Sequence, residues 1–528
     1  MSADERAAGA AEAAATKSAD LGTVARGGAL NLAGTVANGV LTFAFGVVIT
    51  RGLHAAGAGV FFEAIAVFTI ATTVGQLGAD IGVVRAIPQQ RALGRSGAAR
   101  TSVWVALVPV ALASSLIGLL IVAFAPEISR LMIRGGDHAA AIPYLRILGA
   151  FVPVAATSKV LLSAIRGYGT MLPFVLIEYF GKAALRPVLA VAVIALGLGT
   201  TAIALTWAVP IGLGLVAAWL WFRAVVRRSG TTGGAPPRQV AKEFWSFTAF
   251  RGLASFFAIT VLWLQVVLVG ALGSSSEAGV YGAVTRVVTA GAFALQALFL
   301  VMGPQISSLL AQDKRDRATS IYQSSTKWLT AVSFPFYVTI AVFAPFFLRI
   351  FGHGFSDGQT ALVVLSLAML VNMGTGTVTV VLLMSGKSSW NLINTAAAVV
   401  INIALNIVLI PWLGVTGAAI AWAATIAVQN VTPLVQIWVS LKMHPFGESY
   451  LVPVVATAGC YGAVGLIVRF VFGMSVGTLI GFLVIATILY AGILWNFRET
   501  LDLPLLRAAV RARRQRAVSL AAPQPQQP

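Results

Sequence analysis

Long apolar segments alternate with short polar ones along most of the chain. A helix needs ~20 mainly apolar residues to cross the ~30 Å hydrocarbon core of a bilayer. Fourteen segments meet that requirement, centred near residues 38, 72, 113, 152, 184, 211, 257, 292, 339, 372, 400, 427, 461 and 486. The pattern predicts an all-α integral membrane protein with fourteen transmembrane helices.

The pattern also repeats. Ala58-Gly59-Val60-Phe61 opens one apolar segment, and Ala278-Gly279-Val280-Tyr281 opens another 220 positions later. Transporters built from internal repeats bind cargo between the two halves and alternate their access. We therefore expect two six-helix repeats forming two lobes, followed by a C-terminal two-helix hairpin.

The polar breaks set the expected domain boundaries. They are a disordered cytoplasmic tail (1–24), an N-lobe with helices 1–6 (25–222), a basic cytoplasmic linker (223–243), a C-lobe with helices 7–12 (244–440), the hairpin (450–497) and a basic cytoplasmic tail (498–528).

Composition excludes a soluble globule, because 58% of residues are hydrophobic and only 10% are charged, against about a quarter charged in soluble domains.

The net charge of +19 raises the question of nucleic-acid binding. Of the 36 Lys and Arg residues, 25 fall in segments on one side of the membrane, five on the other and six within helices. The positive-inside rule then predicts that both termini lie in the cytoplasm. Because the composition is rich in Ala, Gly and Arg, as in high-GC bacteria, we expect a bacterial plasma (inner) membrane. Nucleic-acid binding is unnecessary, and the basic tail suits anionic lipids at about 1 kcal/mol per basic residue.

The chain lacks the motifs of several enzyme classes. It has no Walker loop, no Cys/His metal cluster, no nucleophile elbow with partners, and no outer loop large enough for a catalytic domain. An ATP-driven pump or a membrane hydrolase needs such machinery. We expect a secondary transporter without cofactor or metal.

Candidate site residues are drawn from the charges inside predicted helices, since each such charge costs about 2.5–3.5 kcal/mol at mid-membrane. Six are cations and three are acids: Arg146, Lys159, Lys182, Arg186, Arg251, Arg286, Glu63, Asp80 and Glu178. Lys159 lies near its helix end, where snorkelling to the interface explains it. For Arg146, snorkelling and a cavity position are equally good interpretations. For Arg251 and Arg286 we favour a cavity position.

Glu178, Lys182 and Arg186 are spaced i, i+4, i+8 and form one helical stripe. One interpretation is a Glu–Lys pair that merely neutralises itself. Because that pair leaves Arg186 uncompensated, we favour a stripe that lines a cavity. A net basic cavity selects an anion such as phosphate or pyrophosphate, whose oxygens match the paired donors of a guanidinium.

The chain resembles the polysaccharide and lipid-linked oligosaccharide flippases of the multidrug/oligosaccharidyl-lipid/polysaccharide exporter superfamily, which include lipid II flippases. The matching stretches, over about residues 25–440, are Thr50-Arg51-Gly52-Leu53, Gly78-Ala79-Asp80-Ile81-Gly82, Ala278-Gly279-Val280-Tyr281 and Asn402-Ile403-Ala404-Leu405-Asn406.

The resemblance implies a polyprenyl-pyrophosphate-linked glycan as the cargo, with glycan-assembly enzymes as further candidate partners. It also implies a central cationic cavity bordered by helices 1, 2, 7 and 8. By position it nominates Arg51, Arg251 and Arg286 for substrate binding and Asp80 for coupling or gating. Many relatives carry an acidic–basic pair late in helix 7, where this chain reads Leu264-Gln265-Val266-Val267.

The main alternative is a drug or cation antiporter, driven by H⁺ or Na⁺, on the same fold. Such an antiporter would need carboxylates in its cavity, whereas here the cations outnumber the acids. A membrane glycosyltransferase would need acidic residues on a sizeable outer loop. A scaffold that does not transport is also compatible with the fold, although the retained charges argue mildly against it. Asn402 and Asn406 are expected to hydrogen-bond between helices.

Overall fold

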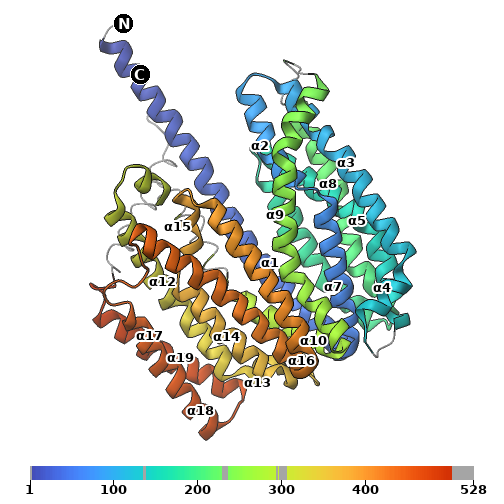
Figure 1. Ribbon diagram of the computed structural model, residues 1–528, viewed down its shortest axis with the longest axis vertical. Coiled ribbons are helices and arrows are strands. Elements are labelled where there is room, and N and C mark those ends of the chain that lie inside the picture. Colours follow the sequence, from blue (N-terminus) through green and yellow to red (C-terminus); the bar gives the residue numbers. More distant parts are fainter. Residues whose placement is uncertain are drawn as a thin grey trace, which may run out of the picture.

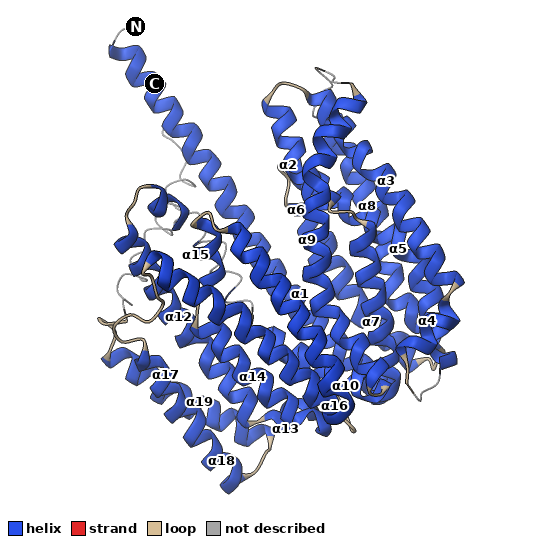
Figure 2. Cartoon of the chain, viewed as in Figure 1, coloured by secondary structure: helices blue, strands red, loops and turns tan. Residues whose placement is uncertain are grey.

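The computed structural model describes residues 3–134, 138–228, 233, 236–292, 295, 302 and 306–501, with every side chain except those of residues 3–32, 249–251, 253–258, 260–262 and 388. All regular elements in these ranges are helices (Figure 2). The predicted all-α class is therefore confirmed.

Two helical bundles make up most of the molecule (Figure 1). The N-terminal bundle contains α2 (Ala79–Ala92), α3 (Ser96–Ala123), α4 (Ala125–Met132), α5 (His138–Gly167), α6 (Leu172–Phe174), the π-helix η1 (Val175–Gly181), α7 (Lys182–Ala195) and α8 (Thr200–Arg228). The C-terminal bundle contains α12 (Arg315–Val342), α13 (Ala344–Arg349), η2 (Ser356–Gly358), α14 (Gln359–Gly374), α15 (Val378–Met384) and α16 (Ser388–Leu441). Beside it lie α17 (Leu451–Thr457), η3 (Ala458–Ala463), α18 (Val464–Phe472) and α19 (Val476–Asn496). Three helices connect the bundles: α1 (Ala3–Gly75), α9 (Pro237–Leu272) and α10 (Ser275–Ala290).

Two helices are too long to cross a bilayer once. At 1.5 Å per residue, the 73 residues of α1 would far exceed the hydrocarbon core. α1 bends at His54 (φ 56°, ψ −176°) and α16 bends at Gly414 (φ 53°, ψ −131°), so each consists of two arms. Predicted spans lie on both sides of each bend.

Eight helices within the described ranges are long and apolar enough to cross a membrane, and the two longest are the bent segments Ala33–Ala92 and Ser389–Leu441. The chain is a multi-span helical membrane protein. The count of fourteen spans stays a prediction.

The structure differs from the sequence prediction at the N-terminus. α1 begins at Ala3 and runs through the segment expected to be a disordered tail. Residues 7–15 include seven alanines, and alanine has the highest intrinsic helix propensity. Local propensity therefore favours a helix in this segment.

The two bundles diverge toward the end that carries the N-terminus and approach each other at the opposite end (Figure 1). α9, expected to begin the C-lobe, contacts α2 and α3 of the N-terminal bundle as well as α16 of the other. At its contact with α2, a Cβ on Gly252 would lie 3.0 Å from the backbone nitrogen of Gly78, whose own φ is 75°. Glycine is needed at such a positive φ and such a close backbone approach.

The two copies of the Ala-Gly-Val motif meet where the second arm of α1 contacts α10, a contact named here the α1–α10 crossing. A Cβ on Gly59 would lie 1.7 Å from the Ser275 carbonyl oxygen, and a Cβ on Gly279 would lie 2.1 Å from the Ala55 carbonyl oxygen. Gly59 thus contacts the residue four positions before Gly279, and Gly279 contacts the residue four positions before Gly59. The repeated Ala-Gly-Val motif packs against its own copy.

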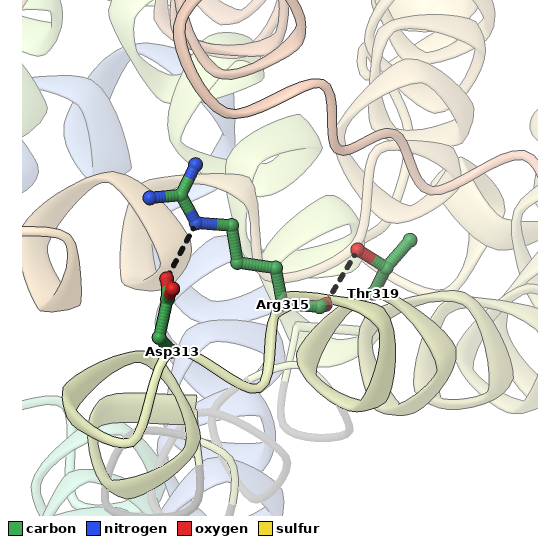
Figure 3. A network of polar contacts seen from close by, with 3 residues as sticks. All are labelled: Asp313, Arg315 and Thr319. Atoms are coloured by element: carbon green, nitrogen blue, oxygen red, sulfur yellow. Dashed lines mark hydrogen bonds and ion pairs between the residues drawn. The ribbon is translucent and has the colours of Figure 1, made fainter.

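A charged corner precedes α12 (Figure 3). Arg315 Nε lies 3.0 Å from Asp313 Oδ1, and the Thr319 hydroxyl donates to the Arg315 carbonyl at 2.9 Å. The ion pair is exposed at both side chains. Exposed pairs contribute about 0–1 kcal/mol, so this corner is compatible with solvent and adds little stability.

We expect Gly59→Ala to destabilise the protein, because the added methyl group collides with main-chain atoms that cannot rotate away. Overpacking of this kind typically costs about 1–3 kcal/mol. Thermal unfolding of the purified protein in detergent measures the effect. Gly481→Ala is the matched control, since no atom lies within 4 Å of that Cβ position. Equal melting temperatures for the two variants would contradict a tight crossing.

Candidate functional site

Glu178 and Lys182 form a partly buried ion pair. Glu178 lies in η1 and Lys182 begins α7, and the Lys182 ammonium donates to Glu178 Oε2 at 2.7 Å. The side chains are 7% (Lys182) and 26% (Glu178) exposed. Lys182 also lies against α8, where a Cβ on Gly214 would be 2.6 Å from Lys182 Cε. The i, i+4 pairing follows the predicted spacing, and these two charges neutralise each other.

Arg186, one turn beyond the pair on α7, has a different environment. Its guanidinium lies over the Trp207 ring of α8, 3.5 Å from the centroid. Its Nε is buried without a hydrogen-bond partner. A cation within about 6 Å of an aromatic centroid is attracted by the ring quadrupole. Stacking stabilises this charge without consuming its hydrogen-bond donors.

Arg286 of α10 is held in the same way from the other repeat. Its guanidinium lies 3.8 Å from the ring centroid of Phe62 on α1, and Nη1 donates to the Gly282 carbonyl at 2.8 Å. The first arm of α1 makes room for it, because a Cβ on Gly46 would lie 2.5 Å from Arg286 Cδ. Arg286 Nε, too, is buried without a partner.

A continuous run of aromatic rings connects the two arginines. The centroid of Trp207 lies 5.5 Å from that of Phe45, Phe45 lies 6.1 Å from Phe61, and Phe61 lies 6.3 Å from Phe62. These separations fall in the range in which ring pairs attract. All four rings are buried. The run therefore fixes Arg186 and Arg286 relative to each other through the two arms of α1.

The other predicted site residues are not gathered around these two. Arg51 is exposed at the α1 bend, where its Nε donates to the Ile350 carbonyl at 2.8 Å, connecting α1 to the segment after α13. Asp80 is half-buried in the first turn of α2. Arg146 is exposed on α5. Arg251 lies in α9, but its side chain is outside the described residues.

Glu63 was recognised in the sequence as an acid at membrane depth but was not nominated for the site. In the structure its side chain is 0% exposed, and neither carboxyl oxygen has a hydrogen-bond partner. It follows the Ala-Gly-Val-Phe motif by two residues. The sequence signal that points to Glu63 is its position beside the repeated motif, on a helix expected to pack against the other half of the chain.

Of the two asparagines on α16, Asn402 hydrogen-bonds across to the other arm as expected, whereas Asn406 bonds within its own arm. Asn402 Nδ2 donates to the Thr425 hydroxyl at 2.8 Å, and Asn406 Nδ2 donates to the Asn402 carbonyl at 2.8 Å. Asn402 and Thr425 lie on opposite arms of α16, which agrees with the packing interpretation for Asn402. No group of three or more His, Cys, Asp or Glu residues suited to a metal occurs in the described part of the chain.

The sequence model of the family described as polysaccharide biosynthesis protein matches residues 61–357, more than half of the chain. A probable low-salt glycan biosynthesis flippase, Agl15 of Haloferax volcanii, is 24% identical over 237 residues, which cover 44% of this chain and 48% of that protein. The chain thus matches about half the length of this curated relative.

Three solved structures share the fold. An inward-facing multidrug resistance MATE family transporter of the MOP superfamily has a TM-score of 0.65 at 16% identity, covering 77% of this chain and 96% of its own. The lipid II flippase MurJ in an inward closed conformation has a TM-score of 0.64 at 12% identity, covering 89% and 98%. A MOP superfamily transporter from Pyrococcus furiosus, described as having a binding pocket of reverse polarity, has a TM-score of 0.56 at 16% identity, covering 80% and 95%. At these identities the likeness concerns the fold.

We expect the Glu178–Lys182 pair to behave as a structural unit. Removing one partner of a buried pair costs up to about 3–5 kcal/mol, whereas replacing both is far less costly. Glu178→Gln and Lys182→Met should therefore each lower the melting temperature, and the double variant should be more stable than Lys182→Glu alone and than either neutral single variant. Thermal unfolding in detergent measures all four. Additive losses in the double variant would show that the two charges act separately.

Proposed function

Because the chain belongs to the polysaccharide biosynthesis protein family, we propose that it moves a polyprenyl-(pyro)phosphate-linked saccharide from the inner to the outer leaflet by alternating access. The chain is a membrane transporter rather than an enzyme. The saccharide would be a precursor of a cell-wall or surface polysaccharide. The glycan flippase and the lipid II flippase among its relatives support this class of cargo.

The observation that carries the proposal is the pair of stacked arginines. Arg186 and Arg286 each keep a buried Nε without a partner, and neither forms an ion pair with an acid of the described residues. A phosphate or pyrophosphate offers oxygens that match the free donors of such a guanidinium and neutralise its charge. The aromatic run between them keeps the two groups in place before the cargo arrives, which lowers the ordering cost of binding.

The arrangement of the bundles supports cargo entry from the cytoplasmic side. The bundles diverge toward the end with the N-terminus (Figure 1), which the positive-inside rule assigns to the cytoplasm. The opposite end is closed by the α1–α10 crossing and by the Arg51 contact with Ile350. Arg251 is a further candidate cation on this path, and Asp80, in the first turn of α2, a candidate for gating.

A cation or drug antiporter is the second candidate, favoured by the MATE transporters among the structural relatives. A cationic drug would need an accessible carboxylate. Among the described residues, Glu178 is already paired with Lys182 and Glu63 is fully buried. We therefore rank the anionic lipid-linked glycan first.

We expect Arg286→Ala and Arg186→Leu to abolish transport, with Arg286→Lys recovering little, because an ammonium lacks the planar stacking face. The assay uses proteoliposomes that contain a fluorescent polyprenyl-diphosphate saccharide and measures its appearance in the opposite leaflet by a membrane-impermeant quencher. Arg130→Ala is the control, since Arg130 is an exposed arginine of the same bundle.

Normal glycan transport by Arg286→Ala and Arg186→Leu would refute the assignment. Mass spectrometry of lipids that copurify with the wild-type protein provides an independent readout. A polyprenyl-linked glycan whose amount falls in these variants supports the proposal. A hydrophobic cation that exchanges for protons would instead support the antiporter.

A further inference from the structure

Glu63 is a buried acid that the glycan-binding proposal does not use. Its side chain is 0% exposed, and both carboxyl oxygens lack a hydrogen-bond partner. The Ser275 hydroxyl of α10 approaches the carboxyl group without reaching hydrogen-bond geometry, and it has no other partner among the described residues. No described cation forms an ion pair with Glu63.

The position of Glu63 ties it to the α1–α10 crossing. It lies one helical turn after Gly59 on the same arm of α1, so both residues share a face. The carboxyl group abuts the main chain of α9, because a Cβ on Gly270 would lie 2.3 Å from Glu63 Oε1. The acid is therefore enclosed by α1, α9 and α10, at the contact that has to separate if this end of the transporter opens.

The charged groups on the neighbouring elements have other partners. Arg134, between α4 and α5, donates from Nη1 to the Leu272 carbonyl at 3.2 Å. Glu277 of α10 completes a capping box with Ser274 at the start of its own helix. Tyr281 of α10 hydrogen-bonds to Gln265 of α9. None of these groups supplies a positive charge to the Glu63 carboxyl.

An unpaired carboxylate in a dry interior is too costly to persist, and such a group neutralises instead. A proton bound to a carboxyl oxygen neutralises Glu63 without needing further space against the main chain of Gly270. In an open crossing, water would reach the carboxyl group and stabilise its charged form. Closure and proton uptake are thus thermodynamically linked.

We propose that Glu63 is a proton-binding site whose protonation closes the α1–α10 crossing and whose deprotonation favours opening toward the outside. The oxygen–hydrogen bond forms with a proton from the outer aqueous phase as the helices close, and it breaks to water as they separate. The inference rests on the proposed alternating access, and it adds the external proton concentration as a control on the outward-facing state.

Cysteine labelling from outside tests the link. In a Cys460→Ser background, Ala55→Cys places a thiol in the closed crossing and Ala56→Cys places one on the exposed side of the same turn. Each is labelled in intact cells with an impermeant maleimide between pH 5.5 and 8.5. Dividing the Ala55→Cys rate by the Ala56→Cys rate removes the pH dependence of the thiol itself.

With Glu63 present, the ratio should rise with external pH, by up to about tenfold per pH unit for one linked proton. In Glu63→Gln the labelling ratio should stay low at every pH, because the amide mimics the neutral acid. Glu63→Asp retains a titrating group and should retain the rise. Glu277→Gln is the matched control, since it neutralises another acid at the crossing and should leave the rise intact.

A flat ratio with Glu63 present, or an unchanged rise in Glu63→Gln, overturns the proposal. Labelling of Ala56→Cys reports correct insertion of each variant. The assay contains no glycan, so its outcome is separable from the proposed cargo. A normal pH response without glycan transport would refute the cargo alone, and glycan transport with a flat ratio would refute the proton site alone.

Discussion

The main-chain contact between the two repeats, at Gly59 and Gly279, is the constraint on which the rest of the architecture depends. Two helices can approach this closely only where neither carries a side chain. The contact sets the position of α10 against both arms of α1. Arg286 can then reach the Phe62 ring, and the Glu63 carboxyl is pressed against the main chain of Gly270. The stacked cation and the buried acid follow from one tight crossing.

The chain stabilises its intramembrane charges in different ways. These ways differ in whether the charged group remains available to bind a ligand. The Glu178–Lys182 pair is mutually satisfied, so it has little left to offer a ligand. Arg186 is supported by a ring face that leaves its donors available. Arg51 donates its Nε to a main-chain oxygen of the other bundle, so it serves as a connection between bundles. Residue type alone does not distinguish these roles, because Lys182, Arg186 and Arg51 are all cationic.

Sequence reasoning reached the helical class and the Glu178–Lys182 spacing, because these depend on periodicities of the chain itself. The layout of two six-helix repeats stays a prediction. Sequence reasoning did not reach the aromatic run, whose rings come from residues 45, 61, 62 and 207 and meet only after folding. The orientation of Arg146 was open for a similar reason, since the rotation of α5 is fixed by its neighbours and not by its own pattern. The burial of Glu63 depends on α9 and α10, which lie 200 residues further along. The helical start of α1 differs from the predicted disordered tail, because an alanine-rich composition with mixed charges is compatible with both states and alanine favours the helix.

The π-helix η1 carries a consequence for how this lobe is assembled. A π turn accommodates one surplus residue within an otherwise regular helix, and here it ends at Gly181, directly before Lys182. The residues on its two sides are therefore out of phase by about a quarter of a rotation relative to an uninterrupted α-helix. With that offset, Arg186 faces Trp207 after the π-helix, while Val175 at its first residue packs against Gly34. A single extra residue thus rotates the side chains that follow it about the helix axis, so that one helix packs against two neighbours lying in different directions.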